Sequence, residues 1–226
     1  MARITYYGHS VIWLEVAGYR LLFDPFITGN PLCPVQPEAL HPDYILLTHA
    51  HGDHWGDTIA IARRTGAMVI GIWEIYDYLQ KQGITNAHPM NLGGRRQFPF
   101  GRLTMTIAHH SSSFPDGTYG GHPAGFLLES EGKIFYNAGD TALSYEMRLL
   151  GERYRIDVAF LPVGDNFTMG PEDALIAAEW LKPRLVVPIH YNTFPVIEVD
   201  IEAFAQQLRE KGIEVRPLRP GEGFTL

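Results

Sequence analysis

The sequence predicts an α/β protein that folds as a single domain over residues 1–226. Two observations favour this class. A chain of 226 residues with 46% hydrophobic content can fill one sizeable core, and chains of this length often form one domain. Strand-like and helix-like segments also alternate along the chain, which is typical of a partly parallel sheet covered by helices.

The charge balance limits the partners of the chain. Eighteen Lys and Arg stand against 25 Asp and Glu, so the formal net charge is −7. No basic run interrupts this acidic background, which disfavours a nucleic acid because phosphate binding needs clustered positive charge. There is no signal-like start and no membrane-length apolar run, so we expect a cytoplasmic protein that acts on a small molecule away from membranes. The sequence leaves open whether it forms a homo-oligomer.

Three short strands are expected first, at residues 3–7, 11–16 and 19–23. Val, Ile and aromatic residues dominate them, and Gly8 and Gly18 separate them, so they predict an opening antiparallel sheet. Asp24 then precedes Pro25 and closes the third strand, a position where Asp is a common turn former.

Residues 28–42 should form an irregular loop, because they lack periodicity and contain Pro31, Pro34, Pro37 and Pro42. A long loop of this kind in a compact domain is often functional, and we predict that it forms a wall or lid of a site. Cys33, the one cysteine, lies in this loop. It excludes an internal disulfide, and we interpret its thiol as incidental.

The densest polar motif follows the apolar run at residues 44–47. Thr48 is followed by His49, His51, Asp53 and His54, which form the pattern His-x-His-x-Asp-His before a helix-like segment. Neutral imidazole and carboxylate are ligands that suit zinc and neighbouring divalent metals. The motif therefore predicts a metal site.

Further candidate site residues follow other expected strands. After a helix at 58–64, a strand at 67–70 and a helix at 74–82, the alternating strand at 102–108 leads to His109 and His110. A hairpin of residues 125–129 and 133–138 leads to Asp140. The strand at 158–163 ends near Asn166, a helix starts at Pro171, and the strand at 185–189 ends at His190 before a last helix that Gly212 terminates.

Side chains at strand ends are held by a rigid sheet, while the loops that they open into face solvent. This placement suits catalysis better than a closed structural site, which would use mostly cysteine.

Residues 49–54, 162–171 and 188–195 resemble the metallo-β-lactamase superfamily, and in particular a bacterial and archaeal branch of metal-dependent hydrolases related to a sugar-acid phosphate lactonase. The resemblance extends from about residue 6 to residue 200. It implies a four-layer αββα sandwich with two similar halves, although no internal sequence repeat is evident.

The resemblance also implies two divalent metal ions, with Zn(II) favoured and Mn(II) or Fe(II) as alternatives. It assigns His49, His51 and His110 to one metal, Asp53, His54 and His190 to the other, and Asp140 as a bridge between them. The motif His-Ser-Ser favours His110 over His109, which would then lie near the pocket or simply pack. Asp24 would support the metal loop through hydrogen bonds, with a plain turn-forming role as the alternative.

Two metals ~3.5–4 Å apart can share a hydroxide and stabilise the oxyanion that its attack creates. Asp53 would orient that hydroxide or receive its proton. Asn166, Tyr191 and Asn192 could donate hydrogen bonds to the oxyanion or the substrate, or could merely stabilise loops. His9 has two interpretations as well, near the pocket or packed in the core.

The leading hypothesis is a two-metal hydrolase that cleaves an ester-type bond, such as that of a lactone or phosphodiester. Redox di-iron relatives carry Glu at the position of His51, which favours hydrolysis here. One alternative is an RNA-processing nuclease, weakened by the acidic charge and the lack of an RNA-holding insertion. The other is a metal-binding protein without catalysis, although no ligand is missing from the set.

Overall fold

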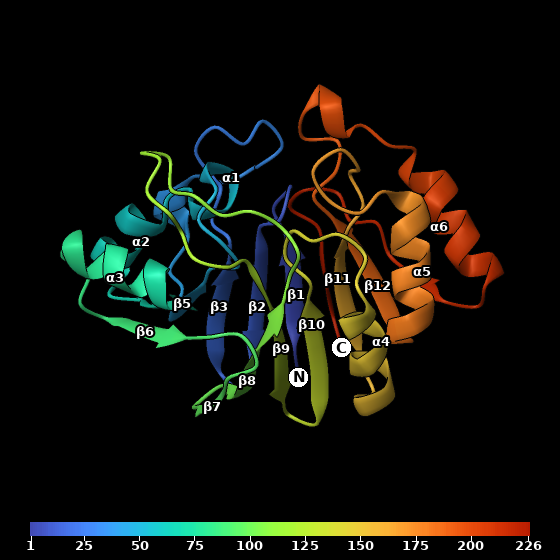
Figure 1. Ribbon diagram of the computed structural model, residues 1–226, viewed down its shortest axis with the longest axis horizontal. Helices are drawn as coiled ribbons and strands as arrows, with labels where there is room; N and C mark the ends of the chain where they lie inside the picture. The colour runs from blue at the N-terminus through green and yellow to red at the C-terminus, as the bar shows by residue number, and fades with distance from the viewer.

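Two seven-stranded mixed sheets lie face to face in the computed structural model, which describes residues 1–226 (Figure 1). The first sheet has the order β14-β1-β2-β3-β4-β5-β6 and the second β13-β12-β11-β10-β9-β8-β7. The strands of the first are β1 (Arg3–Tyr6), β2 (Ile12–Val16), β3 (Tyr19–Phe23), β4 (Tyr44–Leu46), β5 (Met68–Ile72), β6 (Ala87–Met90) and β14 (Gly223–Thr225). Those of the second are β7 (Arg95–Phe98), β8 (Gly101–Ile107), β9 (Ala124–Ser130), β10 (Lys133–Asn137), β11 (Val158–Pro162), β12 (Leu185–Ile189) and β13 (Glu214–Val215).

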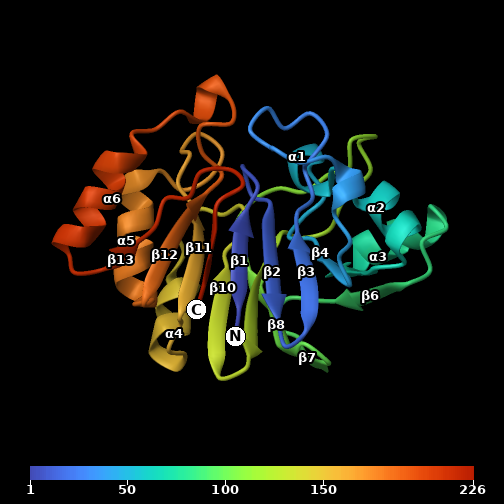
Figure 2. The same ribbon diagram turned by 180° about the vertical axis from the view of Figure 1, so that it is seen from behind.

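Helices cover the outer side of each sheet. The first sheet carries α1 (Gly52–Trp55), α2 (Thr58–Thr65) and α3 (Trp73–Lys81), and the second carries α4 (Tyr145–Arg153), α5 (Pro171–Leu181) and α6 (Ile201–Glu210). Short 3-10 helices occur at η1 (Pro37–Ala39) and η2 (Pro195–Ile197). Seen from behind, the two sheets stand between the two helical groups (Figure 2). The predicted αββα sandwich is confirmed.

Alternation along the strands places apolar side chains on both faces of the sheets. In β11, Val158 and Phe160 pack between the two sheets, while Ala159 and Leu161 pack against the helices. Successive side chains of a strand point to opposite faces, so a strand covered on both sides must be apolar throughout. This double burial makes the sheets a rigid support for the loops at their ends.

Both sheets combine an antiparallel part with a parallel part. In the first sheet β1, β2 and β3 pair antiparallel, and β3, β4 and β5 pair parallel. In the second sheet β8, β9 and β10 pair antiparallel, and β10, β11 and β12 pair parallel. The two halves therefore repeat one topology, although their sequences show no repeat.

Most expected elements form within a few residues of their predicted bounds, and residues 28–42 are irregular apart from η1. Five elements were not predicted from the sequence: α4, β6, β7, β13 and β14. Helix α4 buries only Met147, so it lacks a clear apolar periodicity. Strand β6 contains Pro89, which weakens a strand pattern, and β13 and β14 are only two and three residues long.

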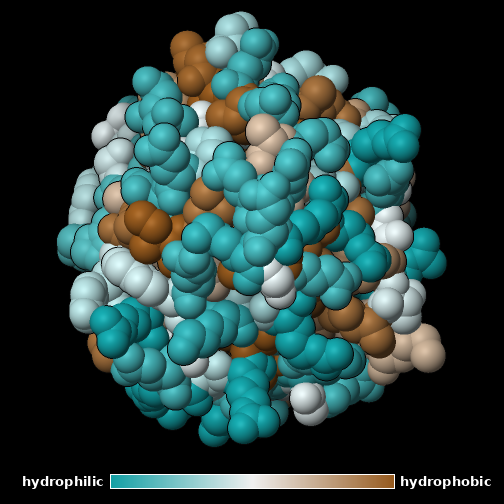
Figure 3. Space-filling view, turned by 90° about the vertical axis from the view of Figure 1, so that its right-hand side faces the viewer, coloured by the Kyte–Doolittle hydropathy of each residue, from teal (hydrophilic) through white to brown (hydrophobic).

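The face of the molecule seen from the α5 and α6 side is mostly hydrophilic, with separate hydrophobic areas (Figure 3). Exposed apolar side chains include Leu149 on α4 and Ile176 on α5. No helix is both long and apolar enough to cross a membrane.

Candidate metal centre

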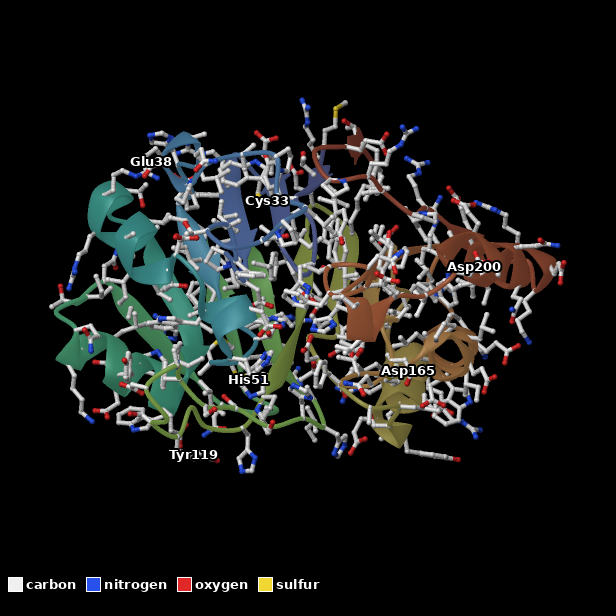
Figure 4. All side chains as sticks on the ribbon, turned by 90° about the horizontal axis from the view of Figure 1, so that it is seen from above. Cys33, Glu38, His51, Tyr119, Asp165 and Asp200 are labelled. Atoms are coloured by element: carbon white, nitrogen blue, oxygen red, sulfur yellow. The ribbon has the colours of Figure 1, made fainter.

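The loop after β4 is fixed from both halves of the molecule. The backbone N–H of Thr48 donates to Asp24 Oδ1 (2.8 Å), and that of Ala50 donates to the hydroxyl of Ser112 (3.1 Å). The Thr48 carbonyl in turn accepts from the backbone N–H of Ala124 (2.9 Å). These hydrogen bonds hold the motif residues at the edge where the two sheets meet. Figure 4 looks down on that edge, with His51 near its centre.

His49, His51 and His110 form one group of converging imidazoles. Nε2 of His49 lies 3.0 Å from Nδ1 of His51. The His110 ring centroid lies 5.1 Å from the centroids of both other rings. His49 is fully buried, whereas His51 and His110 are partly exposed, so the group can be reached from solvent.

Asp140 lies at the centre of the cluster. Its Oδ2 lies 3.0 Å from His190 Nε2, 3.3 Å from His54 Nε2, 3.6 Å from His110 Nε2 and 3.9 Å from His49 Nε2. Gly139 makes this position accessible. It has φ +63°, and a Cβ there would approach the carbonyl of Ala124 to 2.6 Å, so only glycine fits the turn that presents Asp140.

Asp53 and His54, both on α1, join His190 in a second group. Oδ2 of Asp53 lies 3.7 Å from His190 Nε2, and the stacked rings of His54 and His190 have centroids 5.7 Å apart. The Asp53 side chain keeps 30% of its surface exposed, while His54 is fully buried. Asp53 is therefore the member of this group that solvent can reach.

This donor set fits divalent cations. Nε2 of His54 and Oδ1 of Asp140 are buried without any hydrogen-bond partner, a costly arrangement for polar atoms unless another group satisfies them. Imidazole nitrogens and carboxylate oxygens are also the donors that zinc, manganese and iron accept. His49, His54 and Asp140 form a third converging group that joins the other two.

The charges of the cluster are strongly coupled. Burial opposes ionisation of Asp140, but the neighbouring His190 and His54 outweigh it and hold the pKa of Asp140 well below its usual range. The nearby His190 and the hydrogen bond from His9 likewise outweigh burial and lower the pKa of Asp53. In return, the charge of Asp140 overcomes burial and raises the pKa of His190 to about 9.

Burial also opposes the charge of His54, but Asp140 and Asp24 outweigh it and raise the pKa of His54 well above its usual value. Three other imidazoles of the cluster shift in the opposite direction. Burial lowers the pKa of His49, His51 and His110, with neighbouring histidines adding to the effect. These rings are therefore neutral near pH 7, the state in which an imidazole nitrogen can bind a metal.

Asp24 lies behind the motif, as the resemblance implies. Its carboxylate contacts Nδ1 of His54 and accepts two hydrogen bonds from Thr48. Burial raises the pKa of Asp24, although His54 and Thr48 act against it. A carboxylate that orients a ligand histidine from behind is a common feature of metal sites.

The structure separates the two neighbouring histidines after β8. His110 faces the cluster, whereas the side chain of His109 is 52% exposed and lies 3.4 Å from Glu146. The geometry thus agrees with the preference for His110.

Cys33 belongs to none of the converging groups, and its thiol approaches the carbonyl of Val35.

The side chains of Tyr191, Asn192 and Asn166 differ in what they contact. Tyr191 packs into the core beneath α5 and α6, and burial raises its pKa to about 12. Asn192 exchanges two hydrogen bonds with the backbone of Val199, at 2.8 and 3.3 Å, which is the loop-stabilising alternative. Asn166 is exposed in the loop after β11, and its side chain has no hydrogen-bond partner, so its amide remains free to donate.

His9 is the residue whose position the sequence left most open. It lies in the turn between β1 and β2, is completely buried, and contacts Asp53 and Thr193. Thr193 itself was not singled out, because a lone threonine after a histidine carries no recognisable spacing.

Comparison with known proteins shows the family of the chain. The Beta-lactamase superfamily domain matches residues 19–191. A UPF0173 metal-dependent hydrolase of Thermus thermophilus is 53% identical over 226 residues, covering 100% of both chains. One of Bacillus subtilis is 54% identical over 211 residues, covering 91% of this chain and 92% of the relative. Igni18, a metallo hydrolase from Ignicoccus hospitalis, has a solved structure with TM-score 0.91 and 40% identity, covering 100% of this chain and 99% of Igni18.

The fold and the donor cluster together define a metal-dependent hydrolase of the metallo-β-lactamase fold. The chain belongs to the β-lactamase superfamily and, within it, to the UPF0173 metal-dependent hydrolases.

Proposed function

We propose that the protein binds two divalent cations, with zinc favoured, and hydrolyses an ester-type bond of a small molecule. The observation that carries this proposal is the convergence of all seven predicted ligands on one edge of the sandwich, with three of their polar atoms buried and unpaired. Lactones and phosphodiesters are the substrate classes that we favour.

Seven side chains would hold the cations. His49, His51 and His110 form one set, Asp53, His54 and His190 the other, and Asp140, which approaches histidines of both sets, would be shared. Bound cations would lower the pKa of water and stabilise negative charge on the substrate oxygen.

The protein groups complete the chemistry. Asp53 is partly exposed and ionised, so its carboxylate can orient an entering water molecule and accept its proton. The free amide of Asn166 can donate to the oxygen on which charge develops. Tyr191 and Asn192 have no role in this scheme. The side chain of Tyr191 packs in the core, and that of Asn192 is hydrogen-bonded to the backbone of Val199.

Metal analysis of the purified protein, combined with assays on aryl esters, lactones and bis(4-nitrophenyl) phosphate, tests the proposal. We expect two metal ions per chain, turnover of at least one substrate class, loss of turnover on chelation, and recovery when Zn(II), Mn(II) or Fe(II) is restored. Full activity of the metal-stripped protein would refute it. Two bound metals without turnover of any member of a broad panel would favour the non-catalytic alternative.

A further inference from the structure

His9 is held in an unusual backbone conformation beside the cluster. Its φ is +57°, in the left-handed region that residues other than glycine seldom adopt. Its carbonyl accepts a 2.7 Å hydrogen bond from the backbone N–H of His190 and a 3.1 Å hydrogen bond from the hydroxyl of Tyr6. A strained backbone persists only where its surroundings hold it in place, and such strain is common at functional sites.

The imidazole of His9 is enclosed on several sides. The ring centroid of His190 lies 4.1 Å away, and those of Phe194 and Phe26 lie at 5.5 and 5.6 Å. The side chain has no exposed surface. The ring therefore has little freedom to rotate, and solvent does not compete for its two nitrogens.

Each nitrogen of this ring has one polar neighbour. Nε2 lies 3.0 Å from Oδ2 of Asp53, and Nδ1 lies 2.9 Å from Oγ1 of Thr193. An ionised carboxylate only accepts hydrogen bonds, so Nε2 must carry a proton. In the neutral ring Nδ1 is then an acceptor, and the hydroxyl of Thr193 is its donor. The other acceptor within reach of that hydroxyl, the carbonyl of Tyr191, is farther away at 3.3 Å.

We propose that His9 and Thr193 are a positioning pair that sets the orientation of the Asp53 carboxylate. In this arrangement Thr193 donates to His9, and His9 donates to Oδ2 of Asp53. With Oδ2 held, rotation of the carboxylate is restricted, and Oδ1, which has no hydrogen-bond partner, stays available on a side chain that keeps 30% of its surface exposed. The proposal rests on the proposed function, in which Asp53 is both ligand and proton acceptor.

A competing assignment would make His9 itself a ligand, since its nitrogen converges with the ligand atoms of Asp53, His54 and His190. The two assignments require opposite tautomers. A positioning residue carries its proton on Nε2, whereas a ligand would need a bare nitrogen there. Only the first supplies the donor that an ionised Asp53 needs.

The tautomer can be measured without any catalysis. Two-dimensional NMR of the metal-free protein labelled with ¹⁵N-histidine, with His9 assigned by comparison with His9→Gln, should show the Nε2–H form. The same form should persist after zinc is added. Loss of the Nε2 proton on loading, or direct cadmium-113 coupling to His9, would overturn the proposal in favour of the ligand assignment.

Two matched substitutions test the contact itself. The amide nitrogen of Gln can reach the position of Nε2, while that of Asn reaches only the position of Nδ1. His9→Gln should thus retain most of the affinity for the cation that Asp53, His54 and His190 would hold. In His9→Asn that affinity should fall by ~10–100-fold, with a matching fall in kcat but little change in KM. Asn tolerates a positive φ better than Gln, so backbone preference alone predicts the reverse order.

Thr193 provides a second pair. Thr193→Ser keeps the hydroxyl and should rescue the metal affinity that Thr193→Val loses. Zinc affinity, measured by competition with a chromophoric chelator, and the visible spectrum of the cobalt-loaded protein both report the geometry at Asp53. Equal affinities and spectra across all four variants would overturn the proposal.

Circular dichroism and thermal unfolding identify variants that merely misfold. Among the variants that fold, the order of their zinc affinities then tests the positioning role of His9 and Thr193. The outcome is separable from that of the proposed function. If the tautomer and the affinity order hold while no substrate is turned over, the positioning pair stands and the hydrolytic proposal fails.

Discussion

The carboxylate of Asp24 lies 2.9 Å from Nδ1 of His54, and both side chains are completely buried. Thr48 donates its backbone N–H and its hydroxyl to the same carboxylate, at 2.8 and 2.7 Å. With Nδ1 engaged, Nε2 of His54 is directed toward Asp140, 3.3 Å away. Asp24 thereby links the end of β3 to the orientation of a predicted ligand.

Asp24→Asn should weaken zinc binding by ~10–100-fold, because loss of an outer carboxylate leaves the ligand ring less well oriented. It should also destabilise the fold by ~1–3 kcal/mol, since the Asn amide cannot accept from both Thr48 donors and contact His54. Chelator competition measures the loss of zinc affinity, and urea unfolding measures the loss of stability.

Asp157→Asn is the matched control for Asp24→Asn. It removes a carboxylate that binds Ile134 and Arg184 away from the cluster, and its zinc affinity should match the wild type. Wild-type affinity in Asp24→Asn would contradict the supporting role.

His110→Ala and His109→Ala should behave differently although the residues are neighbours. His110 faces His49 and His51, so its loss should lower the metal content and reduce turnover to background. The polar partner of the His109 side chain is Glu146, outside the converging groups, so the second variant should keep its full metal content. Elemental analysis after desalting distinguishes them. If His109→Ala were the variant that lost metal, the assignment would be reversed.

Metal removal should lower thermal stability. A cation that binds only the folded state stabilises it by ~2.7 kcal/mol at 100 times its dissociation constant. For a chain of this size that corresponds to roughly 5–10 °C in Tm. Differential scanning calorimetry of chelated and zinc-reloaded protein measures the shift. An unchanged Tm at saturating zinc would mean that the cluster does not bind it in the folded state.

The bidentate pair between Arg20 and Asp43 should contribute pH-dependent stability. Arg20 donates from Nε and Nη2 to the two carboxylate oxygens, at 3.0 and 2.9 Å, and these hydrogen bonds lower the pKa of Asp43. A lowered folded-state pKa means that the stabilisation is present above the unfolded pKa and is lost as the pH falls through the folded pKa. Because the pair is partly exposed, its contribution should be only ~0.5–1 kcal/mol.

Urea unfolding of Asp43→Asn and wild type should therefore differ by that amount at pH 7 and converge toward pH 3. Arg184→Gln serves as a control, because its 3.4 Å contact with Asp157 is long and its side chain is largely exposed. A difference between wild type and Asp43→Asn that stays constant with pH would show that the carboxylate charge is not involved.

Much of the order of strands and helices was readable from the sequence, because it depends on local chemistry, whereas the assignment of the seven ligands came from the resemblance to the superfamily and stays a prediction. Strands such as β11 and β12 are apolar throughout, which marks burial on both faces. The motif from His49 to His54 is contiguous, and Asp140 and His190 follow such strands directly. Composition and spacing suffice where the relevant residues are close in sequence or tied to a strand end.

Only the tertiary structure decided which of these side chains face one another. The sequence preferred His110 to His109 only through the resemblance, and the structure turns His109 toward Glu146 and His110 toward Asp140. The sequence made Asn192 a candidate donor to the substrate. In the structure both polar atoms of its side chain form hydrogen bonds with the backbone of Val199, seven residues later. His9 and Thr193 lie 184 positions apart, and no local pattern connects them. Their contact exists because burial of the two sheets against each other brings the turn after β1 beside the loop after β12, and that packing depends on the whole core.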